Sequence, residues 1–249
     1  MRIIVCISSV PDTTTKIKLT ADGRGIDLVS AQWIINPWDE LALTRALELR
    51  EAQPPVVTQV TVAIVGKAET EPTLRKALAM GADDAMRIDA EANDAFSVAT
   101  HLAEALRKEP YDIILCGIES SDHNGSAVGG MLAELLGIPS VSSVSSLSVE
   151  IGGISLTREV DGGKENIAIS GSFAAIVQKG IAIVPRIPSM RGIMTARTKP
   201  LKVISAITSK SFTHITGYGL PAPKASCRMV QADNMKELVR LLHEEAKVI

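Results

Sequence analysis

The chain has 249 residues, 46% of them hydrophobic and 22% charged, and its formal net charge is -2 at pH 7. This length suffices for one large domain, or for a domain with an extension. The near-neutral charge predicts no nucleic-acid partner, and an aromatic content of 3% argues against stacking of bases on aromatic side chains.

The cysteines and the apolar runs exclude several further classes of protein. Cys6, Cys116 and Cys227 are scattered and form no CxxC pair, so we expect neither a zinc site nor an iron–sulfur site. The apolar N-terminus is too short for a signal peptide. No apolar run reaches the ~20 residues that a membrane helix needs. We therefore expect no membrane insertion, and a location in the bacterial cytoplasm or an organelle matrix.

The first half of the chain alternates between short apolar runs and helical patterns. The apolar runs predict buried parallel strands at residues 3–7, 59–65, 85–88 and 112–118. The helical patterns cover residues 39–52, 70–81, 96–110 and 126–139. This β-α-β-α order predicts an α/β fold with a parallel sheet.

After Pro139 the pattern changes to alternating apolar and polar residues with Gly-Gly turns. It predicts antiparallel strands that complete or cover the sheet, at residues 146–151, 154–160 and 164–170. A Gly/Pro-rich passage at 217–226 predicts an extended linker, and residues 233–249 predict a helix with an Asp or Asn cap. We thus expect a nucleotide-binding domain of residues 1–210 and a C-terminal arm of residues 211–249, which docks on its own domain or wraps a partner.

Residues 185–200, PRIPSMRGIMTARTKP, contain three prolines, four basic residues and no acidic residue. The segment is too interrupted for a helix interior and too polar for a core strand. We expect a basic, proline-stiffened loop that presents methionine and isoleucine side chains.

The segment most suited to ligand binding is residues 116–137, which lead from a strand end through a polar loop into a helix. Ligands of open α/β sheets bind at the carboxyl ends of strands, and helix N-termini attract phosphate. Gly125, Ser126 and Gly129 would let the backbone approach an anion. The segment matches neither a Walker A loop nor GxGxxG. The alternative is a capped helix with close packing at Gly129 and Gly130.

The sequence offers no convincing catalytic group. His123 beside Asp122 is better explained as polar surface, and no histidine pairs with another at ligand spacing. No Ser-His-Asp set can be assembled. Asn36, before the first clear helix, is suited either to an adenine or ribose edge or to a helix cap. These residues predict a binding site without catalysis.

Several motifs follow one another along nearly the whole chain: VCISSVPDT (5–13), INPWDELAL (35–43), LRKALAMGAD (74–83), SDHNGSAVGGMLAELLGIP (121–139), REVDGGKE (158–165) and PRIPSMRGIM (185–194). In order and spacing the series resembles the electron transfer flavoprotein β subunit family. The resemblance implies a Rossmann-like α/β fold akin to the adenine nucleotide α-hydrolase group, with added antiparallel strands and a C-terminal arm that wraps an α subunit.

The resemblance also implies a role as an electron carrier and not as an enzyme. Family members pass electrons from flavin-dependent dehydrogenases, as in fatty acid or amino acid oxidation, to an acceptor oxidoreductase. The FAD that carries the electrons is held mainly by the α subunit, and the β subunit holds a structural AMP. In electron-bifurcating members a second FAD replaces the AMP. An adenine-nucleotide enzyme or sensor of the same superfamily is a further alternative, but Ser8-Ser9-Val10-Pro11-Asp12 does not supply the SGGxDS loop of such enzymes.

The family's site residues map onto this chain in two groups. The implied nucleotide contacts are Cys6, Asn36, Pro37, Trp38, Asp39, Val65, Asp122, Asn124, Gly125, Ser126, Ala127, Val128 and Gly129. The implied dehydrogenase contacts are Met190, which anchors the recognition loop at 185–200, together with Arg191, Ile193, Arg197 and Lys199. The chain departs from the family pattern in the nucleotide loop, which lacks the usual Thr and Gln.

Overall fold

The computed structural model describes residues 1–224 and 226–249. Its strands are β1 (Arg2–Cys6), β2 (Ser9–Pro11), β3 (Trp33–Ile35), β4 (Gln59–Val65), β5 (Asp84–Asp89), β6 (Ile113–Gly117), β7 (Ser140–Glu150), β8 (Gly153–Val160), β9 (Gly163–Ile169), β10 (Phe173–Val177) and β11 (Leu201–Ser205). Its helices are α1 (Pro37–Glu51), α2 (Glu71–Met80), α3 (Ala95–Leu106), α4 (Val128–Leu136), α5 (Met190–Ala196) and α6 (Met235–Arg240), with a 3-10 turn, η1 (Ala68–Thr70), and a π turn, η2 (Leu241–Glu245).

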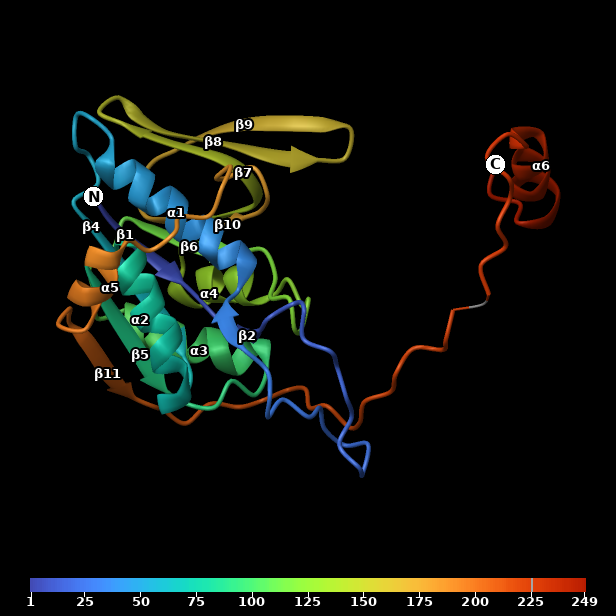
Figure 1. Cartoon of the computed structure of the whole chain (residues 1–249). Coiled ribbons are helices and arrows are strands. Elements are labelled where there is room, and N and C mark those ends of the chain that lie inside the picture. The colour runs from blue at the N-terminus through green and yellow to red at the C-terminus, as the bar shows by residue number, and fades with distance from the viewer. Residues whose placement is uncertain (225) are drawn as a thin grey trace.

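A nine-stranded sheet with the order β11-β5-β4-β1-β6-β10-β7-β8-β9 forms the centre of the domain (Figure 1). The pairs from β11 to β7 are parallel, and β8 and β9 add antiparallel strands at one edge. The long β8–β9 hairpin extends beyond the helices (Figure 1). This architecture confirms the predicted α/β fold with a mainly parallel sheet.

Helices cover both faces of the central parallel strands, which explains why β1, β4, β6 and β10 are mainly apolar. Ile3 and Val5 of β1 pack in one cluster with residues of α1 and α2. Ile4 and Cys6 face the other way and pack in a second cluster with residues of α3 and α4. The side chains of successive strand residues alternate between the two faces.

Four strands were not predicted from the sequence, namely β2, β3, β10 and β11. β2 and β3 form a small antiparallel sheet of their own, so residues 33–35 are not simply a loop before α1. β10 is buried along its whole length between β6 and β7. β7 begins six residues before the predicted strand at 146, and it pairs with β10 on one side and with β8 on the other. The antiparallel strands therefore complete the main sheet and do not cover it.

The basic segment 185–200 is corrected by the structure, because it contains helix α5 (Met190–Ala196). The Ser189 side chain accepts a hydrogen bond from the amide of Gly192 and caps the helix. The prolines at 185, 188 and 200 all lie outside α5, where they do not interrupt its hydrogen bonds. The prediction of a loop failed because the prolines bound a short helix instead of breaking one.

The C-terminal arm stays in contact with the domain beyond the predicted boundary at residue 210. Both Phe212 and Thr213 donate their amides to the Asp94 carboxylate, and the Tyr218 amide donates to the Gly23 carbonyl. The arm then leaves the domain, and α6 lies apart from it (Figure 1). Asn234 caps α6, as predicted, although α6 and η2 end before residue 249. Residue 225, within the predicted linker, lies outside the described residues. Among the described residues, no helix is long and apolar enough to span a membrane.

Candidate functional site

The centre of the sheet contains the change in winding direction where ligands bind in open α/β folds. From β1 the chain builds outward through β4 and β5, and then returns to add β6 on the other side. Cys6 at the end of β1 and Cys116 in β6 are partners in the strand register, and both are buried free thiols. Their strand ends mark the place of the candidate site.

Asn36 connects the segment before α1 to the loop that follows β6. Its side chain is almost completely buried, with 1% of the residue exposed. Its Nδ2 donates to the Glu119 carbonyl at 2.8 Å, and its Oδ1 accepts from the Ser121 amide at 3.2 Å. Asn36 makes no side-chain cap to α1. Both ends of its amide are thus occupied by the chain itself, so its direct role is to hold the loop after β6 in place.

Asp39 makes the corresponding connection between the turn after β1 and the end of β6. Its Oδ2 accepts from the amide and the hydroxyl of Ser8, each at 2.8 Å, and its Oδ1 accepts from the Gly117 amide at 2.9 Å. Burial raises the pKa of Asp39 to about 6, while the hydrogen bonds from Ser8, Asn36 and Gly117 oppose that rise. Asn36 and Asp39 together form a polar frame behind the candidate site.

The other predicted residues on the strands and on α1 gather around this frame. Cys6 and Val65 end the neighbouring strands β1 and β4, and they are 7% and 9% exposed. Pro37 and Trp38 begin α1 and are half-buried. The structure therefore brings these four residues to the same edge of the sheet as Asn36 and Asp39.

The predicted phosphate loop lies beside this frame and is exposed from Asp122 to Ser126. Asn124 and Ser126 have left-handed φ angles of 48° and 47°. No side chain caps α4, which begins at Val128 after Ala127. The free amides of such a helix start are suited to an anion.

The Ser121 hydroxyl gives independent support for a ligand at this place. In residues 1–224 and 226–249, it is the one buried side-chain oxygen or nitrogen that lacks a hydrogen-bond partner. Buried polar groups are nearly always paired, so this hydroxyl suits a site that binds a polar ligand. The Ser126 hydroxyl contacts the Glu119 carboxylate at 3.4 Å, an interaction that a bound phosphate would have to replace.

Gly129 has a packing role in the structure. A Cβ atom at Gly129 would lie 2.8 Å from Ile176 Cγ1 and 3.2 Å from Cys116 Cβ, whereas one at Gly130 would meet nothing within 4 Å. Gly129 therefore lets α4 pack closely on β6 and β10, which was the alternative explanation. Gly125, by contrast, lies in the exposed loop with open space around its Cα.

The residues predicted to contact a partner divide into two groups. Met190 is 77% exposed and Ile193 46% exposed, on a helix where Arg191 and the following Arg197 are also exposed. Lys199 differs, because its ammonium group donates to backbone carbonyls inside the domain.

Sequence reasoning missed three contributors to these sites. Met194, one helical turn after Met190, is 72% exposed and extends the apolar surface of α5. Gly117 lies so close to Trp38 and Asp39 that a Cβ atom there would overlap both. Ser121 was the third. The spacing of the two methionines was the one available signal, and it was hidden by the assumption of a loop.

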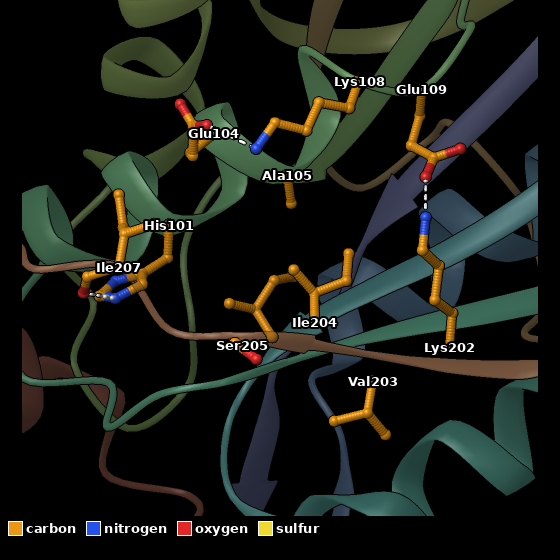
Figure 2. A pocket seen from close by; sticks show the side chains of 11 residues that line it. His101, Glu104, Ala105, Lys108, Glu109, Lys202, Val203, Ile204, Ser205 and Ile207 are labelled. Atoms are coloured by element: carbon orange, nitrogen blue, oxygen red, sulfur yellow. Dashed lines mark hydrogen bonds and ion pairs between the residues drawn. The ribbon is translucent and has the colours of Figure 1, made fainter.

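Two cavities of the domain lie away from this site. The larger, of about 300 Å³, lies between α3 and β11 and is lined by His101, Lys108 and Lys202 among others (Figure 2). Lys108 pairs with Glu104, and Lys202 pairs with Glu109. His101 Nε2 lies 3.2 Å from the Ile207 carbonyl. These groups are satisfied by one another and need no ligand. Within the described part of the chain, no group of acidic, cysteine or histidine residues could hold a metal ion.

Comparison with known proteins gives a consistent result. Residues 26–209 match the electron transfer flavoprotein domain family. The chain is 35% identical to the electron transfer flavoprotein subunit beta of Syntrophomonas wolfei, over 91% of this chain and 88% of that protein. It is 34% identical to the subunit of the same name from Bacillus subtilis and 32% identical to that from Bradyrhizobium diazoefficiens, in both cases over the full length of both chains.

Proposed function

This chain belongs to the electron transfer flavoprotein β subunit family, and we propose that it pairs with an α subunit to form a heterodimeric electron carrier. Electrons pass from flavin-dependent dehydrogenases to an acceptor oxidoreductase through an FAD held mainly by the α subunit. The β chain binds a structural AMP and docks the dehydrogenase. It catalyses no reaction of its own, and it works in the bacterial cytoplasm or an organelle matrix.

The uncapped start of α4, at the end of the loop that contains the orphaned Ser121 hydroxyl, carries the AMP proposal. The phosphate would bind the amides at residues 125–129, where the helix terminus favours negative charge. Cys6, Val65, Pro37 and Trp38 would enclose the nucleoside at the strand ends. Asn36 and Asp39 would act behind them by fixing the loops.

The arm supports the proposed assembly with an α subunit. Leu220, Met229 and Met235 are each more than half exposed along a segment that extends away from the domain. So much apolar surface on an extended segment is typical of a chain that is buried against a partner. The α subunit of the carrier is the partner that the family assigns to it.

Native mass spectrometry of the protein purified from its own source tests this function. We expect a complex of one α-like subunit, one FAD and one AMP per β chain. Two FAD molecules and no AMP would move the protein to the electron-bifurcating class. A monomer or homo-oligomer without flavin would overturn the proposed function. An adenine nucleotide that the flavin-free protein hydrolyses would favour an enzyme of the superfamily.

A further inference from the structure

Helix α5 lies directly against α2, with which it shares a core (Figure 1). Ala196 of α5 is 3% exposed and packs among buried residues of α2. A Cβ atom at Gly192 would overlap the Ala79 carbonyl, so glycine permits contact between the two backbones. The inner side of α5 is therefore fixed on the domain, while Met190 and Met194 remain exposed.

Arg75 extends from α2 to the end of α5. Its Nη1 donates to the Ala196 carbonyl at 2.8 Å and to the Lys199 carbonyl at 3.0 Å. The last carbonyls of a helix have no partner within the helix, so a cation there satisfies them and interacts favourably with the helix dipole. Arg75 thus secures the C-terminal end of α5.

Lys199 makes the reciprocal connection from the segment after α5 to the end of α2. Its Nζ donates to the Leu78 carbonyl at 3.0 Å and to the Ala82 carbonyl at 2.5 Å. Partial burial lowers the pKa of Lys199, with Arg50 also lowering it and Asp83 opposing the change. An ammonium group committed in this way is not available to an incoming protein.

We propose that Arg75 and Lys199 are positioning residues of the docking helix. They form a reciprocal clamp between α2 and α5 that holds Met190 and Met194 outward, and they do not touch the dehydrogenase. This inference rests on the proposed docking function. Because the clamp already orders α5, this helix loses less conformational entropy when it binds the dehydrogenase.

The exposed side of α5 also indicates the chemistry of the surface that it fits. Arg191 and Arg197 are exposed and form no ion pair with any described residue. Met190 directly precedes Arg191, and Met194 lies between the two arginines in sequence order. The complementary partner surface is an apolar pocket edged by carboxylates, in which methionine fills the pocket and arginine steers the approach.

Hydrogen exchange on the purified heterodimer tests the clamp without a partner. We would compare Arg75→Met and Lys199→Met with the control Arg191→Met, which alters an exposed cation of the same helix. Amides of residues 193–197 should exchange at least about tenfold faster in the two clamp variants, because each loses hydrogen bonds from a charged group. The control should exchange like the wild type. Wild-type exchange in both clamp variants would overturn the inference.

Electron-transfer kinetics separate positioning from steering. The probe is a panel of purified acyl-CoA dehydrogenases, each reduced by its substrate and mixed with the heterodimer at several ionic strengths. We expect Lys199→Met to raise the KM for the carrier about tenfold, with kcat and the salt dependence unchanged, whereas Arg191→Met should weaken the salt dependence. A weakened salt dependence in Lys199→Met would make Lys199 a steering residue and overturn its assignment. If no dehydrogenase reduces the wild type, the docking function fails, while hydrogen exchange still decides the clamp.

Discussion

The carboxylate of Asp39 accepts a hydrogen bond from the amide of Gly117 at 2.9 Å, which joins the first turn of α1 to the end of β6. The same carboxylate binds Ser8, in the turn after β1. One buried acidic side chain therefore sets the separation of the two strand ends between which the nucleotide is proposed to bind.

Asp39 should give the protein a measurable pH dependence. Burial raises its pKa from the usual value of 3.8 to about 6, so the folded state holds this proton more tightly than the unfolded state does. Between these two pKa values the unfolded state binds fewer protons, and the free energy of unfolding falls as the pH rises. For Asp39 alone the loss is on the order of 3 kcal/mol. Urea unfolding of the wild type and of Asp39→Asn at several pH values measures this loss of stability.

The test compares how the free energy of unfolding changes with pH in the two proteins, and not how large it is at any one pH. Asp39→Asn loses an acceptor at every pH, but it has no carboxyl group to titrate. The stability of the wild type relative to the variant should therefore fall between about pH 4 and pH 6. A constant difference across this range would show that burial does not raise the pKa of Asp39.

Gly117→Ala should disturb the frame from the opposite side. The added methyl group would overlap the Asp39 carboxylate and the Trp38 side chain, and neither is at the free end of a flexible chain. Overpacking of this kind typically costs about 1–3 kcal/mol. We expect a lower free energy of unfolding and a lower nucleotide content. Gly125→Ala is the matched control, since a Cβ there meets nothing within 4 Å, and its stability should equal that of the wild type.

Gly129 and its neighbour Gly130 should respond in opposite directions. Gly129→Ala places a methyl group 2.8 Å from Ile176 Cγ1, and about 1–3 kcal/mol of stability should be lost. Gly130→Ala adds a methyl group in open space within α4 and should gain about 0.5–1 kcal/mol from helix propensity. Denaturant unfolding of the two variants checks both signs. Equal effects would mean that close packing at Gly129 does not matter.

Much of the fold could be predicted because buried parallel strands and amphipathic helices leave strong local patterns. The predicted strand at 59–65 has the bounds of β4, and those at 3–7 and 112–118 differ from β1 and β6 by one residue at each end. β10 was missed because its apolar run, FAAIV, lies among residues that alternate like an antiparallel strand. Its place between β6 and β7 depends on contacts distant in sequence, which no local pattern contains.

The site was less predictable than the fold. Family motifs singled out Asn36 and Asp39, but their hydrogen bonds to residues 117–121 became visible only in the folded chain. Gly129 had two explanations, and its close packing against Ile176 became visible only in the folded chain. The contacts of Lys199 could not be predicted either, because the sequence does not show whether a lysine faces solvent or donates to the end of a helix.

Asp94 should control how firmly the arm is attached to the domain. Its Oδ1 caps α3 at Ser97, and its Oδ2 accepts the amides of Phe212 and Thr213. Asp94→Ala should therefore expose the arm to faster cleavage by trypsin after Lys210, which mass spectrometry can follow.

Two controls distinguish the attachment from the helix cap. Phe212→Ala keeps the cap but removes the ring that packs against Phe96 at a centroid distance of 4.8 Å, and it should also speed cleavage at Lys210. Cleavage after Lys224, beyond the attachment, should stay the same in all variants. If only Asp94→Ala had an effect, loss of the cap and not of the attachment would be responsible.

Met190 and Arg191 should affect docking in different ways. Met190→Ala removes an exposed side chain that would become buried in the partner, and the rate of reduction by a dehydrogenase at low carrier concentration should fall about tenfold at any salt concentration. Arg191→Glu should reduce the rate most at low ionic strength, where charge steering is strongest. The FAD absorbance of both variants should match that of the wild type. Ile151→Ala alters a similarly exposed apolar side chain in the turn between β7 and β8 and should leave the rate unchanged. Wild-type rates for Met190→Ala and Arg191→Glu at low salt would exclude α5 as the docking surface.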